Sequence, residues 1–538
     1  MLTILFILCF IILFIGYKVY GRFLANTFDL NVLRPTPAMV LNDNKDYVPS
    51  HILMIFGHHF SSIAGAGPII GPILAATLFG WLPAMLWILI GSIFIGGMHD
   101  FTALIASVRH KGKSIAEIAK NTLGKEAYLS LLIFMLLSLI YILIVFLDLT
   151  ASTFVNNGSV ATSSIFYIIL ALCLGIILKN TKKSLLIYSV PFVILLFIFI
   201  IIAQKIPLSS FSLFGLTPKE TWQVILVFYC FLASILPVWI LLQPRDYLSS
   251  YLLYFAVIVG LIGILFSSKS IQFPHFIPAL QRFHNIGSIF PVLFITVACG
   301  AVSGFHSLVS SGTTSKQIHK ETDTLTVGYG GMIVEAVVAL IALATVMLIT
   351  RANAQALGNP LAIFSHGIGS FLNLAGIPQT LGKSMGLLII STFVLTTLDT
   401  ATRISRYIIQ ELFDWTSKKQ IILAAIIALA GPFISIFIKT HDPKTGALIP
   451  IWRIIWPVFG TTNQLLAAIT LIVIFAWAKT LKIKNRAFIL IPAIFMYIIT
   501  LYSLTLLILN NPLIIIKITS ILLLLLASHL VYVCFKAK

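Results

Sequence analysis

The stretch "HHFSSIAGAGPIIGP", residues 58–72, places two histidines, a run of small residues and two prolines inside an apolar segment. Glycine and proline are the poorest helix formers, so this stretch predicts a break in a helix. Its neighbours are apolar enough to lie in a membrane, where backbone groups cannot turn to water. A break at that depth is tolerated only where the irregular backbone is buried in protein or lines a cavity. We therefore expect the stretch to mark a binding site.

The composition of the 538-residue chain is that of a membrane protein. It is 59% hydrophobic and 9% charged, with a mean hydropathy of +1.06, whereas soluble globular proteins carry about 25% charged residues. The five cysteines lie far apart in apolar runs, without the spacing of a disulfide framework or a zinc site. Candidate spans lie near residues 2–19, 52–80, 82–107, 128–150, 163–178, 185–204, 222–242, 251–267, 290–312, 327–350, 384–402, 421–438, 454–478, 487–508 and 512–534.

These stretches predict an all-α polytopic protein of about fifteen transmembrane helices, forming one integral membrane domain over residues 1–538. The first stretch lacks a basic start and a small-residue cleavage site, so we expect a retained helix. The segment 361–374 is too short to span and is expected to be a half-helix or an interfacial helix.

The net charge of +19 is explained by membrane topology rather than by nucleic-acid binding. Most lysines and arginines follow odd-numbered spans, and basic loops stay in the cytoplasm. We therefore expect the N-terminus outside, the C-terminus in the cytoplasm, lipid around the chain and no nucleic-acid partner. The sequence gives no indication of oligomeric state.

A second segment repeats the residue spacing of the first. Gly57, His59 and Gly65 recur at the same spacing as Gly304, His306 and Gly312 in "PVLFITVACGAVSGFHSLVSSGTT", the ninth span. Two spans after each lies a Leu-Asp followed by Thr and Ala, in "LDLTAS" at 147–152 and "LDTATR" at 398–403. Spans two and nine cross the membrane in opposite directions, which predicts an inverted-repeat transporter. The alternative is that the small residues only let helices pack closely, without a ligand.

Ionisable residues inside spans are costly and usually functional. Asp399 is the preferred cation or proton site because threonine hydroxyls surround it, and an internal pair with Arg403, four residues on, is the alternative. Histidines could carry protons, although a structural role is the simpler expectation for each. Adjacent His58 and His59 diverge by about 100° on a helix, so they do not suit one metal. For Arg245 and Asp246, which follow span seven, we expect anchoring of the span end rather than gating.

The predicted site combines two sets of residues. The substrate-binding set is His58, His59, Ser61, Ser62, Gly65, Ala66, Gly67, Ser303, Gly304 and His306. The ion-coupling or proton-coupling set is Asp399, Thr396, Thr397, Thr400, Asp100, Asp148 and Glu335. We expect neither a cofactor nor a bound metal, and the coupling ion is H⁺ or Na⁺.

Longer motifs resemble the carbon starvation protein A family, the peptide and pyruvate transporters of the amino acid–polyamine–organocation superfamily. The resemblance is carried by "RPTPAMV", "DYVPS", "FGHHFSSIAGAGPIIGPILAA", "HDF", "PRDYLS", "ACGAVSGFHSLVSSGTTSKQI", "GYGGMIVE", "TTLDTATRISRY" and "FGTTNQLLA", in order from residue 34 to 467. It implies a LeuT-like core of five helices and their inverted copy, with spans two and nine as the unwound helices. Span eleven, with Asp399, would partner the first of these at a cation site.

The resemblance also divides the chain. The first repeat is expected over residues 51–204, two intervening helices over 222–267, the second repeat over 290–478 and flanking helices over 487–534. The expected function is import of short peptides or pyruvate into a bacterial or archaeal cell, by proton symport with alternating access. Alternatives are a Na⁺-coupled transporter of amino or organic acids, or a channel. An enzyme is not expected, because HExxH, GxSxG and a paired catalytic aspartate motif are missing from the sequence.

Overall fold

The computed structural model is helical throughout the part of the chain that it describes. This part comprises residues 2–44, 46–180, 185–208, 212–267, 270–278, 289–439, 441, 446, 448, 449, 451–511 and 513–536. Within these ranges the regular elements are helices, apart from one isolated bridge between His441 and Leu448. The all-α prediction is confirmed.

Twelve helices of the described residues are long and apolar enough to cross a membrane, and a bent pair supplies a thirteenth span. The bent pair is α3 (Ile52–Ile63) with α4 (Gly67–Phe79). The uninterrupted α-helical spans are α1 (Leu2–Thr27), α8 (Lys125–Asn156), α9 (Gly158–Asn180), α12 (Leu242–Phe266), α18 (Gln379–Phe413), α19 (Lys418–Ser435), α20 (Ile451–Thr480), α21 (Ala487–Asn510) and α22 (Ile514–Lys536).

Three further spans are composite. One runs from α5 (Trp81–Ile90) through the π-helix η1 (Gly91–Gly96) into α6 (Gly97–Arg109). Another joins α13 (Ile289–Val297), the 3₁₀ turn η4 (Ala298–Gly300), α14 (Gly304–Gly312) and η5 (Thr314–Lys316). In the last, the π-helix η6 (Leu325–Tyr329) leads into α15 (Gly330–Met347). π-Helical turns often occur at functional sites.

The remaining helices are shorter. Two of the fifteen predicted stretches form helices that are not among these spans: α11 (Pro218–Ile235), and α10 (Leu185–Ala203), an apolar helix whose fully described part is Ile187–Ala203. The segment expected to be too short to span is α17 (Pro360–Asn373), a helix of 14 residues. The others are α2 (Pro37–Val40), α7 (Ile115–Leu123) and α16 (Arg351–Leu357).

The boundary between spans seven and eight differs from the prediction. α11 ends at Ile235 and α12 begins at Leu242, whereas the sequence was divided after residue 242 and again before 251. Leu236 is extended, with φ −67° and ψ 148°, because the proline that follows disfavours helical backbone at the preceding residue. Arg245 and Asp246 therefore lie inside the first turns of α12 and not in a loop.

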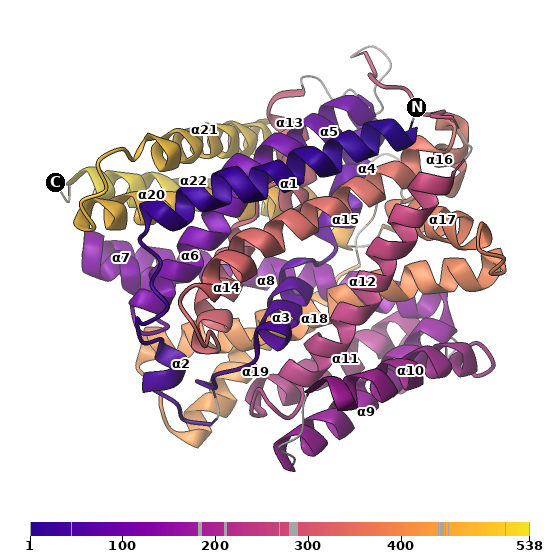
Figure 1. The fold of residues 1–538 in the computed structure, drawn as a ribbon, viewed down its shortest axis with the longest axis horizontal. Helices are drawn as coiled ribbons and strands as arrows, with labels where there is room; N and C mark the ends of the chain where they lie inside the picture. Colours follow the sequence, from indigo (N-terminus) through magenta and orange to yellow (C-terminus); the bar gives the residue numbers. More distant parts are fainter. Residues whose placement is uncertain are drawn as a thin grey trace.

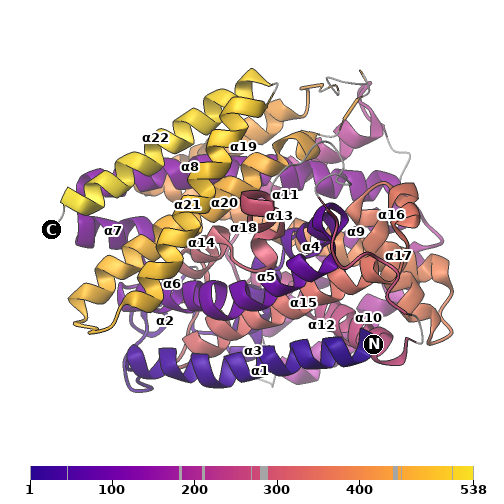
Figure 2. The same ribbon diagram turned by 90° about the horizontal axis from the view of Figure 1, so that it is seen from above.

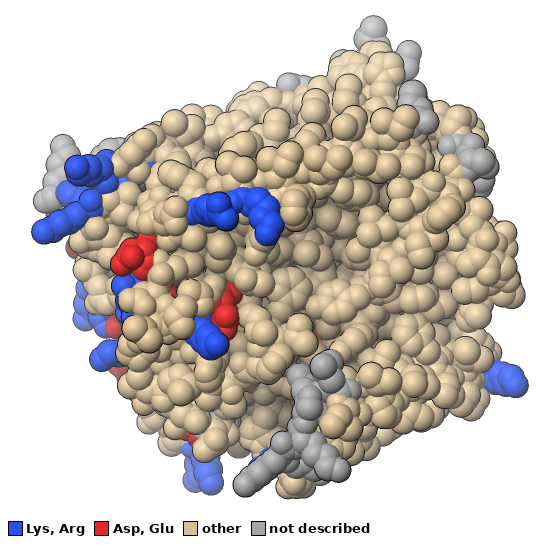
Figure 3. All heavy atoms as spheres, in the orientation of Figure 1, with Lys and Arg blue, Asp and Glu red and all other residues tan. Residues whose placement is uncertain are grey.

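The outer helices present an apolar surface to lipid. On α1, Ile4 and Phe14 are 66% and 61% exposed, and similar side chains cover α22. The space-filling view shows a broad face with few charges in its middle (Figure 3). So large an apolar surface is a liability in water but is what a bilayer-spanning protein needs.

The helices enclose a buried centre. α1 and α22 lie on opposite edges, with α4, α14 and α18 between them (Figure 2). The two termini lie at opposite ends of the long axis, the N-terminus near α16 and the C-terminus near α7 (Figure 1). Lysines and arginines gather at the end that holds the C-terminus, here called the basic end (Figure 3).

Candidate functional site

The first helix break lies where the glycines and prolines predict it. α3 ends at Ile63 and α4 begins at Gly67, with a bend of 40° between them. Hydroxyls of α18 stabilise the broken end: Thr396 Oγ1 donates to the Ser61 carbonyl at 2.9 Å and Thr397 Oγ1 to that of Ser62 at 3.2 Å. These donors satisfy carbonyls that a continuing helix would otherwise have bonded.

The second break, between Val297 and Gly304, is also confirmed. Here the partners are amide side chains of α20. Asn463 Oδ1 accepts a hydrogen bond from the Phe305 N–H at 2.8 Å and one from Ser303 Oγ at 3.1 Å. Gln464 Nε2 donates to the Val302 carbonyl at 3.0 Å. Asn463 and Gln464 were not predicted as site residues, although two adjacent amides inside an apolar span are an available signal.

The two breaks cross in close contact. A Cβ on Gly71 would lie 2.6 Å from the Thr296 carbonyl oxygen, and Gly67 packs on the Cys299 side chain. The cavity between them has room for about one water molecule. Its lining comprises Ile63, Gly65, Gly67, Ile142, Phe146, Cys299, Phe305, Thr397 and Phe459. The centre of the protein is therefore closed in this conformation.

Beside the first break lies a buried group that we call the arginine cluster: Arg245, Asp246, Asp399, His58 and Tyr229. The guanidinium of Arg245 pairs with both Asp246, at 2.5 Å, and Asp399. His58 Nδ1 lies 2.5 Å from Asp246 Oδ2, and the Tyr229 hydroxyl donates to Asp399 at 2.8 Å. The three charged side chains are completely buried.

The arginine cluster corrects two expectations. Asp399 pairs with Arg245 and not with Arg403, which instead donates to the carbonyls of Ala233 and Leu236 and lies 3.8 Å from Asp46. Arg245 was expected to anchor the end of a span, yet it joins α12 to α18. The span boundary caused the error, because it placed this residue in a loop.

A second buried group, called here the histidine cluster, comprises His59, His99, Asp100, His306 and Glu335. Asp100 lies between two imidazoles, with His306 Nδ1 at 2.7 Å and His99 Nδ1 at 2.8 Å from its oxygens. His306 Nε2 lies 3.3 Å from Glu335 Oε2, and all five side chains are fully buried. His59 interacts electrostatically with Asp100 and His306, and its Nδ1 lies 2.9 Å from Thr314 Oγ1.

The structure thus separates the predicted site residues into groups. Ser61, Ser62, Thr396, Thr397 and Thr400 join α3 to α18 beside the arginine cluster; Ser62 Oγ lies 3.5 Å from Thr400 Oγ1. Gly65, Ala66, Gly67, Ser303 and Gly304 form or border the breaks. Asp148 belongs to neither cluster, since Lys219 pairs with it at 2.7 Å and Gln223 donates to it at 2.9 Å. The divergence of His58 and His59 is confirmed, because each joins a different cluster.

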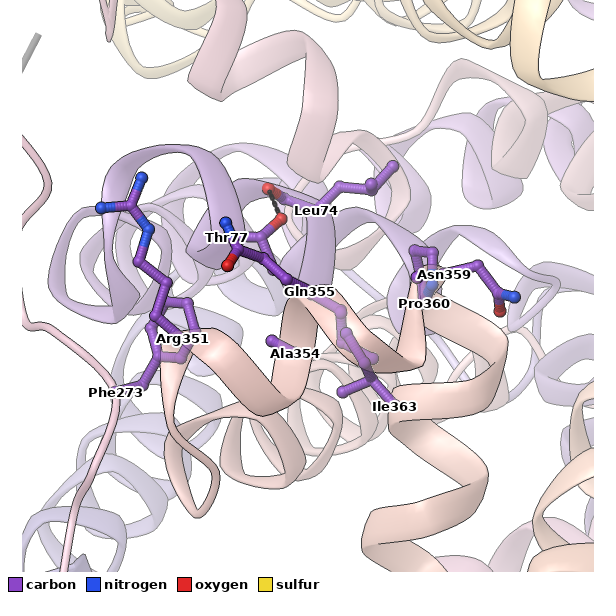
Figure 4. A pocket seen from close by; sticks show the side chains of 11 residues that line it. Leu74, Thr77, Phe273, Arg351, Ala354, Gln355, Asn359, Pro360 and Ile363 are labelled. Carbon is purple, nitrogen blue, oxygen red and sulfur yellow. Dashed lines mark hydrogen bonds between the residues drawn. The ribbon is translucent and has the colours of Figure 1, made fainter. Parts of the chain in front are cut away.

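Two pockets open at opposite ends of the molecule. At the basic end, a pocket of about 460 Å³ reaches Leu308 and Ser311 of α14 and Ile404 of α18. At the other end, a pocket of about 220 Å³ lies between α4, α16 and α17. Figure 4 shows Arg351 at one side of this pocket, Asn359 at the other and Gln355 between them. The crossing of the two breaks separates the pockets.

Loop residues 46–50, called here the strap, contact η5 and α18 at the basic end. The Val48 N–H donates to the Lys316 carbonyl at 3.1 Å, and the Tyr407 hydroxyl donates to Asp46 at 2.6 Å. Burial alone would raise the pKa of Asp46. The positive charge of Lys316, the Tyr407 hydroxyl and nearby arginines outweigh this effect and lower the pKa. Asp46 therefore fixes the strap as a carboxylate.

Comparison with known proteins identifies relatives over most of the chain. Residues 1–364 and 353–503 match the family model described as carbon starvation protein CstA. The peptide transporter CstA of Helicobacter pylori strain J99 is 34% identical, over 91% of this chain and 79% of the relative. The pyruvate/proton symporter BtsT of Escherichia coli K12 is 31% identical, over 91% of this chain and 79% of the relative.

A solved structure confirms the fold class. A crystal structure of the manganese transporter of Eremococcus coleocola matches with a TM-score of 0.52 at 12% identity, covering 92% of this chain and 98% of that one. At this identity the likeness concerns the fold alone, which is LeuT-like. The division into two five-helix repeats stays a prediction.

Proposed function

Because the chain belongs to the carbon starvation protein CstA family, we propose that it imports small carboxylate-bearing nutrients, short peptides or pyruvate, together with protons. Membership of this family makes it a transporter and not an enzyme. The substrate classes follow the names of the relatives, one a peptide transporter and another a pyruvate/proton symporter. This import takes place across the cell membrane under carbon starvation.

One observation carries the transport mechanism: two interrupted helices cross at a closed centre between two end pockets. A closed centre with a pocket on each side fits alternating access, in which the substrate site opens to one side at a time. The helices α4 and α14 both begin beside this crossing, and helix N-termini favour a carboxylate. Opening the centre by separating the two breaks would admit a small anion.

Asp399 is less suited to the coupling ion than its sequence context indicated. The guanidinium of Arg245 already neutralises it, and a second cation at the same carboxylate would meet electrostatic repulsion. We propose that the arginine cluster instead holds α3, α12 and α18 together while the centre is closed. Breaking it would accompany opening.

The test is uptake by the purified protein in proteoliposomes. Labelled pyruvate and a labelled dipeptide are offered separately under an inward proton gradient, an inward sodium gradient, or neither. We expect accumulation of one substrate class under the proton gradient, and counterflow of that substrate without a gradient. Accumulation driven by sodium alone would support the Na⁺-coupled alternative, and flux without counterflow would support a channel. Uptake that is insensitive to both gradients would contradict coupled transport.

A further inference from the structure

The histidine cluster contains a contact that requires an exchangeable proton. His306 Nδ1 faces Asp100 Oδ2 at 2.7 Å, so its hydrogen is directed to that carboxylate. On the other side of the ring, Nε2 lies 3.3 Å from Glu335 Oε2, and neither this nitrogen nor the two Glu335 oxygens has a hydrogen-bond partner. A bare ring nitrogen and an ionised carboxylate are both acceptors, so this approach is favourable only with a proton between them.

Among the described residues, no lysine or arginine pairs with the two carboxylates of the histidine cluster. The side chains that face His306 and Glu335 are Asp100 and His99 on α6, His59 on α3 and the Cys299 thiol on η4. None of these is a lysine or an arginine, in contrast to the arginine cluster. Because buried charges without partners are costly, the number of bound protons sets the energy of the histidine cluster.

The histidine cluster includes residues of both broken helices. His59 lies on the first broken helix and His306 on the second, while each acid follows a Gly-Gly-Met sequence, at residues 96–98 and 330–332. Asp100, which follows Gly-Gly-Met 96–98, contacts His306 of the second broken helix. In Gly-Gly-Met 330–332, a Cβ on Gly331 would lie 3.2 Å from the His59 ring of the first broken helix. A proton bound here therefore acts on both breaks at once.

From these observations we infer that the coupling ion is a proton bound between His306 and Glu335, with Asp100 as the acceptor that orients the His306 ring. The proton enters from one side of the membrane, binds to the Glu335 carboxylate and is shared with His306 Nε2. It leaves to the other side after the centre reopens. Nitrogen atoms occupy the contacts of both Asp100 oxygens, whereas a hard cation such as Na⁺ takes oxygen ligands. This inference rests on the proposed function for the link to transport.

The variant Glu335→Gln tests the inference, because it keeps the size of the side chain and removes the exchangeable proton. With a membrane potential of 100 mV, the wild type is expected to accumulate a zwitterionic dipeptide roughly fifty-fold, because one net positive charge enters with it. Pyruvate and one proton carry no net charge together, so its accumulation is measured under an inward pH gradient. We expect Glu335→Gln to reach equilibrium only, yet to retain substrate counterflow. Glu321→Gln, at a buried carboxylate outside the cluster, is the matched control and should still accumulate substrate. Wild-type accumulation by Glu335→Gln would overturn the inference.

A second measurement does not depend on transport or on the identity of the substrate. Infrared difference spectra of the detergent-solubilised protein, recorded between two pH values, report protonation of a buried carboxyl group. We expect a carboxylic-acid band that is lost in Glu335→Gln, shifted in Glu335→Asp and retained in Glu321→Gln. Unchanged spectra in Glu335→Gln would overturn the proton site even if that variant transports poorly. If the expected band is observed but neither pyruvate nor a peptide is taken up with protons, the proton site stands and the proposed function is contradicted.

Discussion

Among the described residues, Arg245 is the only lysine or arginine that pairs with Asp246 and Asp399. Removing one partner of a buried ion pair costs about 3–5 kcal/mol, because the remaining charge is left in a medium of low polarity. We expect Arg245→Gln to lower the unfolding temperature in detergent, because it leaves both carboxylates buried without their partner. Thermal unfolding followed by tryptophan fluorescence measures the effect.

The matched control is Arg453→Gln, because Arg453 is exposed and stacks only loosely on Trp452. This change should alter stability by about 0.5 kcal/mol or less. Adding Asp399→Asn to Arg245→Gln should restore part of the lost stability, since it removes one of the two uncompensated carboxylates. Strict additivity of the two single effects would contradict the pairing.

Glu321 gives a pH dependence outside the membrane spans. Arg109 Nε donates to it at 2.8 Å, Arg34 Nη1 at 2.7 Å and the Asn31 N–H at 2.9 Å. Burial alone would raise the pKa of Glu321, but these hydrogen bonds lower it below the usual value of 4.5. A lowered folded-state pKa stabilises the protein above the unfolded value, and this contribution is lost as the pH falls through the folded one.

We therefore expect Glu321→Gln to destabilise the protein at pH 7 by about 2 kcal/mol, the range for hydrogen bonds to charged groups. The difference from the wild type should shrink as the pH falls below about 4.5, because the wild-type carboxyl then also becomes neutral. Denaturation in detergent at a series of pH values measures it. A difference that stays constant down to pH 3 would show that the carboxylate charge is not the cause.

At the residue scale, the sequence identified the buried acids but not their partners. Asp399 and Glu335 stand out because a carboxylate in an apolar span is rare. Their partners Arg245 and His306 lie far away in the sequence, and only the packing of α12 on α18 and of α14 on α15 brings them together. Local spacing instead suggested Arg403, whose side chain points to carbonyls of α11 and the turn after it.

At the scale of helices, interruptions could be predicted where the residues themselves disfavour a helix. Gly65, Gly67 and Pro68 act locally, so the first break was predicted within a few residues of its position. The π-helices η1 and η6 were not predicted, because they depend on how two segments pack: Gly97 approaches the Tyr329 ring, and Gly328 approaches the Phe101 backbone. The end of α11 was missed although Pro237 marks it.

The approach of α4 to α13 gives a prediction at this scale. A Cβ on Gly71 would lie 2.6 Å and 2.7 Å from the carbonyl oxygens of Thr296 and Val297, which are backbone atoms and cannot rotate away. We expect Gly71→Ala to lower stability by about 1–3 kcal/mol, as overpacking does, and to slow transport by preventing the two breaks from closing on each other. Thermal unfolding and proteoliposome uptake measure the two effects.

Gly21→Ala is the matched control for Gly71→Ala. Gly21 is also a buried glycine inside a helix, but its Cβ would meet the Tyr329 ring at an ordinary 3.5 Å. Alanine is the better helix former by about 0.5–1 kcal/mol, so this variant should be neutral or slightly stabilised. If both variants behave alike, the close approach at Gly71 does not constrain the crossing of the breaks.

On the scale of the whole molecule, composition was sufficient for the fold class but not for the exact architecture. All fifteen predicted stretches contain helix, although α10 and α11 are not among the spans. The boundaries at 51–204, 222–267, 290–478 and 487–534 remain predictions. However, α12 bonds to the first broken helix through Asp246, much as α20 bonds around the second break through Asn463. A helix placed between the repeats thus contributes to the site, which hydropathy alone does not reveal.

The distribution of charge gives the last prediction, the orientation in the membrane. The basic end holds the C-terminus, and the N-terminus lies at the opposite end (Figures 1 and 3). Since basic segments stay in the cytoplasm, we expect Leu33, in the loop bonded to Glu321, to face inward and Phe214, before α11, to face outward. These side chains are 88% and 96% exposed. A membrane-impermeant maleimide should label Phe214→Cys in intact cells and Leu33→Cys only after permeabilisation, with the parent chain as the background control. The reverse pattern would place the basic end outside and would contradict the predicted orientation.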